Sequence, residues 1–384
     1  MTQYKHPLSM AVSVRVLLGI WLALVAIGFS PYRAGSGKED VDIFSANMVE
    51  YAFFNIWEKW DGANYVNLIK YGYTPELPGH TNYGPLYPFG AQAVDRLLFH
   101  HPILTALLVS FIFAAALVAV LYAYILDVFK DEGLARDTIW LLLFYPASFF
   151  FFAPFSDGLF VLLAILFFIA LRKEKWVYAG AAALLAGLAR TQGALLILPL
   201  LYELYRKRAQ VFPASAKAAL AGVLLSPLGV VGFALYKLNL GYPSPIEGLY
   251  QSNTIIFVNP VKGYTLALKQ FFETHSLLVL SEILSLTLFA ALLMWMISQK
   301  RFRDEAALLV YSAANLLLFL SKYASQATAL QSSNRYVLSL FPVFIGMAAL
   351  VSRLSPGMQK IIRLLFFGLL LITSAAFGLG YFIG

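Results

Sequence analysis

Long apolar segments recur along the whole of this 384-residue chain. Many of them are about 17–25 residues long, the length that an α-helix needs to cross roughly 30 Å of hydrocarbon. Backbone polar groups in lipid must be satisfied within the segment, so we expect the spans to be helices. The Leu-, Ala- and Phe-rich runs lack the two-residue alternation of a membrane β-barrel. The sequence therefore predicts an all-α polytopic integral membrane protein.

Eleven runs are candidate spans, and two longer polar stretches lie between them. We expect the spans at about residues 10–29, 103–127, 137–153, 157–171, 176–190, 192–205, 215–238, 274–298, 305–321, 335–352 and 360–383. The polar stretches cover about residues 30–102 and 239–273. No internal repeat and no Gly/Ser-rich linker divides the chain. We therefore expect a single transmembrane domain over residues 1–384.

Composition excludes several other classes of protein. Only 12% of the residues are charged and the mean hydropathy is +0.74, which excludes an ordinary soluble domain. The net charge of +8 comes from basic residues in short loops, where topology signals and attraction to anionic headgroups explain it without nucleic acid. The chain has no cysteine, so disulfides and thiolate metal sites are excluded.

The basic residues also predict which loops face the same side of the membrane. If the N-terminus is inside, most Lys and Arg residues lie in short inner loops, and both long polar stretches face outward. Four polar elements then meet on the outer side: the first long loop with Asp61 and His80, and the turns at Ser156–Asp157, Arg190–Gly193 and Ser332–Tyr336. This convergence is the main sign of a functional site.

Residues 47–60 have the pattern of an amphipathic helix. One stripe at helical spacing holds Asn47, Glu50, Tyr51, Asn55 and Glu58, and the opposite face holds Val49, Phe53, Ile56, Trp57 and Trp60. We expect this segment to lie in the plane of the membrane interface and to deliver Trp60-Asp61 at headgroup depth.

Several motifs occur in a fixed order between residues 57 and 342. They are Trp60-Asp-Gly-x-x-Tyr65 with Gly72-Tyr73, Pro85-Leu-Tyr-Pro88, the hairpin Phe144–Phe160, Ala189-Arg-Thr-Gln-Gly193, and Arg335-Tyr336 with Phe341-Pro342. This series resembles the PIG-V-like mannosyltransferases, that is, GPI mannosyltransferase II and its prokaryotic relatives. The resemblance implies a GT-C-class glycosyltransferase that uses a polyprenyl-phosphate sugar. Two departures leave the sugar and the acceptor open: Asn82-Tyr-Gly84 replaces an aromatic pair, and the hairpin acid is Asp157 rather than Glu.

Asp61 is the candidate catalytic base. Glycosyl transfer from a lipid phosphate with inversion needs a carboxylate that takes the proton of the acceptor hydroxyl. The alternative is that Asp61-Gly62 is simply a turn. Trp60 is interpreted as a wall of the sugar pocket or as an interfacial belt tryptophan.

Two arginines are candidates for holding the donor phosphate, because a guanidinium binds phosphate through two hydrogen bonds. Arg335 is the first choice and Arg190 the second, with Lys322 and His80 as weaker candidates. For both arginines, snorkelling from a helix end is the alternative.

Other side chains are candidates for substrate contacts. Asp157 is a second carboxylate of the site or the N-cap of a helix. We expect no metal; if a divalent cation is used, Asp61 and Asp157 are its candidate ligands. The remaining candidates for sugar or lining contacts are Gly62, Tyr65, Tyr87, Gln192, Asn334 and Tyr336.

The sequence thus predicts a membrane glycosyltransferase. It would move a hexose, with mannose expected, from a polyprenyl-phosphate donor such as dolichyl phosphate mannose to a lipid-linked or surface glycan. We expect a multi-pass protein of a prokaryotic plasma membrane with its site outside, or at the lumenal face of the endoplasmic reticulum in a eukaryote. The alternative is a transporter or flippase of lipid-linked saccharides, against which stands the lack of a repeat or of a mid-membrane polar site.

Overall fold

The structure is a computed structural model, and it describes residues 5–29, 48–74, 83–97, 100–242, 255–324 and 328–383. The chain divides into two compact units, each of which is treated by itself below. Unit 1 comprises residues 1–162 and 351–383, and unit 2 comprises residues 163–350. A single domain over the whole chain stays a prediction.

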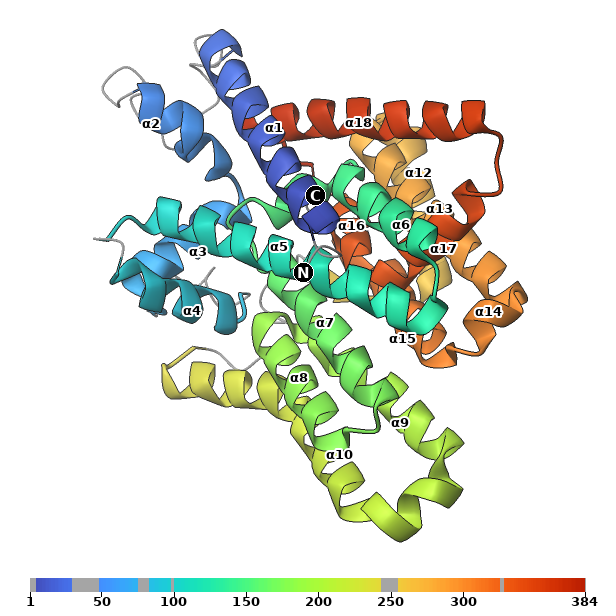
Figure 1. Ribbon diagram of the computed structural model, residues 1–384. Coiled ribbons are helices and arrows are strands. Elements are labelled where there is room, and N and C mark those ends of the chain that lie inside the picture. The colour runs from blue at the N-terminus through green and yellow to red at the C-terminus, as the bar shows by residue number, and fades with distance from the viewer. Residues whose placement is uncertain are drawn as a thin grey trace. The chain divides into compact units, whose positions relative to one another are not determined.

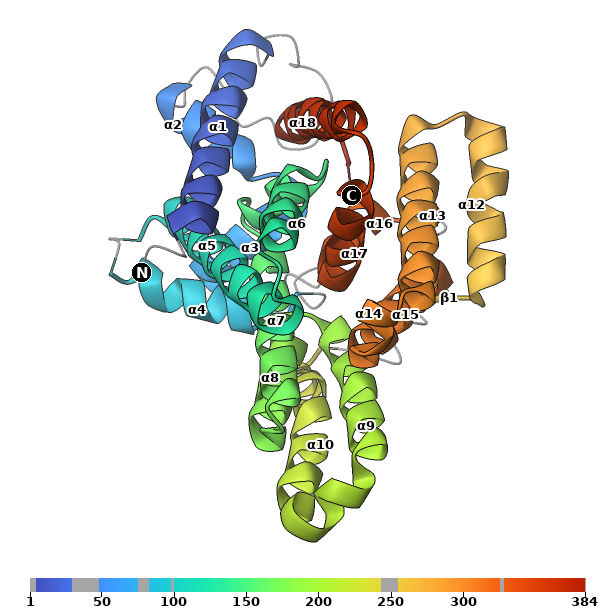
Figure 2. The ribbon, with the colours of Figure 1, turned by 45° about the vertical axis from the view of Figure 1, so that its right-hand side comes forward.

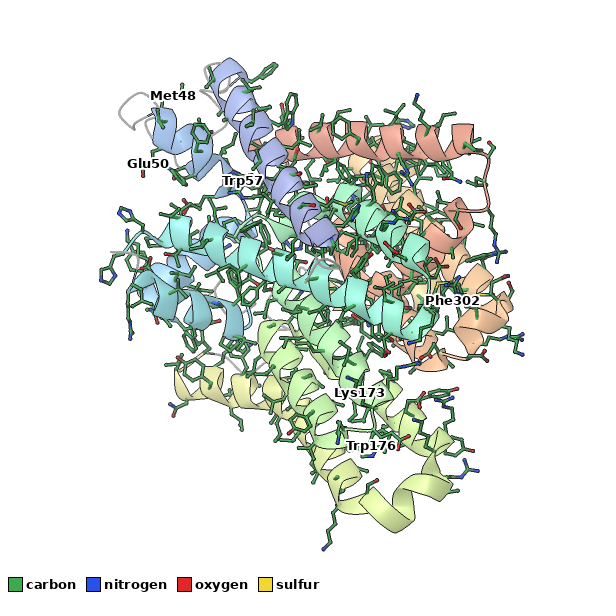
Figure 3. All side chains as sticks on the ribbon, in the orientation of Figure 1. Met48, Glu50, Trp57, Lys173, Trp176 and Phe302 are labelled. Atoms are coloured by element: carbon green, nitrogen blue, oxygen red, sulfur yellow. The ribbon has the colours of Figure 1, made fainter. Side chains whose placement is uncertain are left out.

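Unit 1 is built from helices of very different lengths (Figure 1). They are α1 (Lys5–Phe29), α2 (Met48–Phe53), η3 (Asn55–Trp57), α3 (Asp61–Tyr71), α4 (Leu86–Asp95), α5 (Pro102–Phe129), α6 (Glu132–Phe144), η5 (Ser148–Phe151), the start of α7 (Asp157–Arg172) and α18 (Pro356–Gly378). Arg15 of α1 lies over the ring of Trp57, 4.4 Å from its centre, and Figure 3 shows Trp57 beside that helix.

Unit 2 holds the rest of α7 and all but the last residue of α17. Its helices are α8 (Trp176–Ala189), η6 (Thr191–Leu196), α9 (Ile197–Arg206), α10 (Arg208–Asn239), α12 (Pro260–Thr274), α13 (Leu277–Ser298), α14 (Lys300–Arg303), α15 (Ala306–Ser321), α16 (Ser333–Tyr336), η7 (Val337–Ser339) and α17 (Phe341–Val351). A short antiparallel ladder pairs β1 (Ile255–Phe257) with β2 (Lys322–Ala324), and Phe257 lies opposite Lys322. Figure 2 shows α12 alongside α13.

The all-α polytopic membrane fold is confirmed, but among the described residues fewer long helices form than the eleven runs predicted. Within the described ranges, five helices are long and apolar enough to cross a membrane: His6–Phe29, Pro102–Phe129, Ser215–Asn239, Leu277–Ser298 and Pro356–Gly378. The pair Ser333–Ser339 and Phe341–Val351, bent by 86°, gives a sixth if it counts as one broken span.

Proline explains one of the shorter helices. The run expected at 137–153 ends as a helix at Phe144, because Tyr145 precedes Pro146 and takes an extended conformation, with ψ 141°. Residues 148–151 then form the separate 3-10 turn η5. A helix of 13 residues such as α6 is about 20 Å long, less than the thickness of the hydrocarbon layer.

The amphipathic helix predicted over residues 47–60 is shorter than expected. α2 ends at Phe53, η3 follows over three residues, and α3 begins at Asp61. Tyr51, assigned to the polar stripe, is buried, whereas Phe53 is 47% exposed. Tertiary packing against α1 therefore overrides the simple helical period here. The expected position of this segment in the plane of the membrane interface stays a prediction.

Glycines let α8 and α10 pack closely in unit 2 (Figure 2). A Cβ on Gly180 would overlap the backbone of Gly222, and one on Gly222 would overlap the backbone of Trp176. Gly229 lies in the same way against the backbone of Leu184. The α10 helix therefore approaches α8 backbone to backbone, as small residues allow in membrane helices.

Candidate active site

Asp61 is the first residue of α3, and its side chain is partly exposed. The Tyr83 hydroxyl donates a hydrogen bond of 2.9 Å to its Oδ1, and Asn64 Nδ2 donates to the Tyr83 oxygen, also at 2.9 Å. The free N–H groups of a helix start carry partial positive charge, which stabilises a carboxylate at this position. Asp61 is thus fixed in orientation while it keeps access to solvent.

Trp60 is held in an unusual backbone conformation directly before Asp61. Its φ of 54° with ψ of −128° lies in a region that residues other than glycine rarely adopt. Its indole Nε1 donates to the carbonyl of Tyr381 at 3.1 Å, and its ring meets Phe382 edge to face at 5.1 Å. The C-terminal residues therefore fix the tryptophan beside the candidate base.

The predicted hairpin packs against the first turns of α3. A Cβ on Gly62 would lie 3.3 Å from the Trp57 carbonyl oxygen and 3.4 Å from the Phe155 ring, so a side chain there would force these neighbours to shift by a few tenths of an ångström. The Tyr65 hydroxyl bonds Ser156 Oγ at 2.7 Å. Asp157 follows as the first residue of α7 and is buried. The two acids therefore come from neighbouring segments of unit 1.

Tyr65 is the centre of an aromatic cluster under the site. Tyr83, Tyr87 and Phe155 all meet its ring at centre distances of 4.9–6.1 Å. Tyr87 is fully buried, its hydroxyl donates to the Ala106 carbonyl at 3.0 Å and bonds Ser110 Oγ at 2.8 Å, and burial raises its pKa. The Tyr87 side chain thus holds α4 against α5.

Glu58 lies three residues before Asp61, and burial raises the pKa of its carboxyl group.

Unit 2 gathers three cations around Tyr336. Lys322 Nζ donates to the Tyr336 hydroxyl at 2.8 Å and lies 4.5 Å from the ring centre. The guanidinium carbons of Arg190 and Arg335 each lie 5.3 Å from the same ring centre. The segments expected to converge at Arg190 and at residues 332–336 therefore do meet within this unit.

A polar face of α13 supports the segment that carries Arg335. Asn334 Oδ1 accepts from Ser285 Oγ at 2.7 Å, and its Nδ2 donates to Ser281 Oγ at 2.8 Å. Glu282 is fully buried and accepts the backbone N–H of Ser332 at 3.0 Å. Ser332 itself has a φ of 68°, so this hydrogen bond holds a left-handed residue at the start of α16.

Gln192 carries an unused donor in the described structure. Its Nε2 is buried and has no hydrogen-bond partner among the described residues. Gly193 next to it lies so close to Ala186 and Gly187 that a Cβ would overlap their backbone. The close approach fixes η6 against α8, directly after Arg190.

Some expectations stay untested. His80 lies outside the described residues. In the described part of the chain, no three or more His, Asp or Glu residues gather as metal ligands would. The roles given to the individual site residues, and metal independence, stay predictions.

Three features of the site were missed in the sequence. Tyr83 lies within the Asn82-Tyr-Gly84 departure, and nothing in that pattern indicates a contact with Asp61. Glu282 is an acid inside an apolar run, a signal that by itself marks a functional or structural role in membrane helices. The contact of Phe382 with Trp60 leaves no local pattern, because the two residues lie far apart in the sequence.

No family model and no curated protein matches the chain. Among solved structures, the crystal structure of ArnT from Cupriavidus metallidurans bound to undecaprenyl phosphate is similar over 85% of this chain and 73% of that one, with 15% sequence identity and a TM-score of 0.52. The likeness confirms an all-α polytopic membrane fold similar to that of ArnT. The resemblance to the PIG-V-like family stays a prediction.

Proposed function

We propose that this chain is a membrane glycosyltransferase with a polyprenyl-phosphate-linked sugar donor and Asp61 as its general base. The observation that carries the proposal is Asp61 itself: a partly exposed carboxylate at a helix start, oriented by Tyr83. The likeness to ArnT, which was solved with undecaprenyl phosphate, supports the donor class. The motif series supports a hexose, with mannose first, and a lipid-linked or surface glycan as acceptor.

The proposed reaction is a single displacement. The acceptor hydroxyl oxygen attacks C1 of the sugar, the bond between C1 and the phosphate oxygen breaks, and the hydroxyl proton passes to Asp61. The sugar leaves with inverted configuration and the polyprenyl phosphate departs. Trp60, the residue directly before Asp61, would form one wall of the sugar site and exclude water.

The cation cluster around Tyr336 suits the departing phosphate. Arg190, Lys322 and Arg335 supply three positive charges around the Tyr336 ring. A net positive charge remains for a phosphate whose own charge grows as the bond breaks. The buried Gln192 donor would gain an acceptor from a sugar hydroxyl or a phosphate oxygen, which removes the free-energy cost of leaving it unsatisfied.

The test is transfer by the purified full-length protein in detergent, with a radiolabelled polyprenyl-phosphate mannose and a glycolipid acceptor. Asp61→Asn keeps the size of the side chain and removes the base, so transfer should fall roughly 10²–10⁴-fold while insertion and donor binding persist. Asp304→Asn, which changes an exposed acid at the end of α14, is the matched control and should keep wild-type transfer.

Two results would contradict the proposal. Wild-type transfer by Asp61→Asn would remove Asp61 as the base. Donor binding without any product in detergent, together with lipid translocation in sealed vesicles, would favour the flippase instead, because only an enzyme makes product without a sealed membrane.

A further inference from the structure

We propose that unit 1 carries a second lipid contact: a site for the phosphate headgroup of an anionic phospholipid, between α1, α6 and α18. An open cavity of about 340 Å³ lies there, lined by His6, Met10, Gly133, Arg136, Asp137, Trp140 and Arg363. The three helices pack against one another, and Figure 2 shows them as neighbours. None of these side chains belongs to the proposed transfer site.

The charge of the cavity wall favours an anion. Arg363 pairs with Asp137 at 2.7 Å, so these two charges offset each other. Arg136 is exposed and forms no ion pair with any carboxylate that the structure describes. Among the residues that line the cavity, one full positive charge therefore remains, and His6 adds hydrogen-bonding nitrogens. A phosphate oxygen would accept from the Arg136 guanidinium in a charge-assisted hydrogen bond.

The wall also has the geometry of a headgroup site. Gly133, Arg136, Asp137 and Trp140 follow one face of α6 at helical spacing, and Gly133 leaves room because it has no side chain. The Arg363 guanidinium lies 5.5 Å from the centre of the Trp140 ring, which holds that side of the cavity in place. A volume of this size lies at the lower end of the range for small-molecule pockets and suits a headgroup.

The surroundings favour a lipid over a free anion. His6 and Met10 lie in the first two turns of one candidate span, and Arg363 lies in the second turn of another. Large apolar side chains are exposed nearby on the same helices, among them Leu8, Val12, Ile361 and Leu364. A polar cavity at the start of apolar spans is where the phosphate of a phospholipid would lie while its chains cover the exposed helices. Basic pockets between membrane helices commonly bind anionic headgroups.

The test is native mass spectrometry and thermal unfolding of the full-length protein in neutral detergent. Phosphatidylglycerol is titrated against phosphatidylcholine with the same acyl chains, and inorganic phosphate is a third arm. We expect phosphatidylglycerol alone to bind and to raise the Tm. Arg136→Gln should lower its apparent affinity about tenfold, the change expected when a hydrogen bond to a charged group is lost. His6→Gln should also lower the apparent affinity for phosphatidylglycerol.

Arg303→Gln is the matched control, because it removes the same charge from an exposed position on α14 that does not line the cavity. Equal affinities of the Arg136 and Arg303 variants would overturn the site. An equal rise in Tm with inorganic phosphate would overturn the lipid assignment and show a site for a free anion. Neither result depends on glycosyl transfer, so this inference and the proposed function can fail separately.

Discussion

Tyr83 is the residue on which the orientation of the candidate base depends. Its hydroxyl donates to Asp61 and accepts from Asn64, so a single oxygen connects two turns of α3 with the segment before α4. Its ring also packs against the ring of Tyr65, with 4.9 Å between the ring centres. This packing helps to hold the Tyr83 hydroxyl in position. A carboxylate that must meet an incoming hydroxyl gains from such preorganisation.

We expect Tyr83→Phe to lower transfer about 10- to 100-fold without loss of membrane insertion. The change keeps the ring and removes one hydrogen bond to a charged group, worth about 1.5–3 kcal/mol. The measurement is kcat/KM in detergent, beside thermal unfolding. Tyr178→Phe, which alters a tyrosine 71% exposed on α8, should leave both unchanged. Unaltered transfer by Tyr83→Phe would show that this hydrogen bond does not orient Asp61.

Residue patterns in the sequence predict only some of the residues of this site. The Asp61 motif and the 332–336 segment stand out, because both belong to the motif series and both lie in loops expected on the same side of the membrane. Tyr83 does not stand out, since its role depends on where a loop returns to α3. Glu282 could have been found: an acid inside an apolar run needs a partner, and the backbone of Ser332 supplies one.

At the scale of elements, the packing of α10 on α8 supports the segment that carries Arg190. The backbone of Gly229 lies against that of Leu184, and a Cβ there would also come within 2.9 Å of the Leu184 carbonyl carbon and 3.1 Å of the Leu188 nitrogen. Gly232, one turn further along α10, has no atom within 4 Å of the position of a Cβ. The same helix therefore contains one glycine at which a Cβ would clash, Gly229, and one at which a Cβ would meet no neighbour, Gly232.

Gly229→Ala should lower the free energy of unfolding by about 1–3 kcal/mol, because the two helices must move apart. Gly232→Ala should leave it unchanged or raise it by up to about 1 kcal/mol, because alanine favours a helix over glycine. Both are measured by denaturant unfolding in detergent. If the two variants were destabilised equally, close backbone packing would not be the reason for Gly229.

The sequence predicts where helices form better than it predicts how long they are. Apolar runs identify helices throughout, and all five long candidates fall within expected spans or close to them. The short helices differ because proline and tertiary contacts end them: α6 ends before Pro146, and α2 ends at Phe53 under packing against α1. Those contacts depend on distant segments, and a local hydropathy pattern does not contain them.

At the scale of the whole molecule, contacts within unit 1 join residues from opposite ends of the chain. Trp60 meets residues 381 and 382, and Trp21 donates to the Leu371 carbonyl at 2.9 Å. Helices α1 and α18 thus belong to the same unit as the candidate base. The positive φ of Trp60 persists because these distant partners hold its ring.

A double-mutant cycle on Trp60 and Phe382 tests this link. Trp60→Ala and Phe382→Ala should each lower the free energy of unfolding, and their effects should fall short of additivity by about 0.5–1.5 kcal/mol, the value of an edge-to-face aromatic pair. Trp60→Ala combined with Phe272→Ala, which alters a ring 70% exposed on α12, should be additive. Because the Phe382 ring also fixes the wall next to Asp61, Phe382→Ala should lower transfer more than Phe272→Ala does. Full additivity of the Trp60 and Phe382 changes, measured by denaturant unfolding in detergent, would show that the C-terminal residues do not hold the tryptophan.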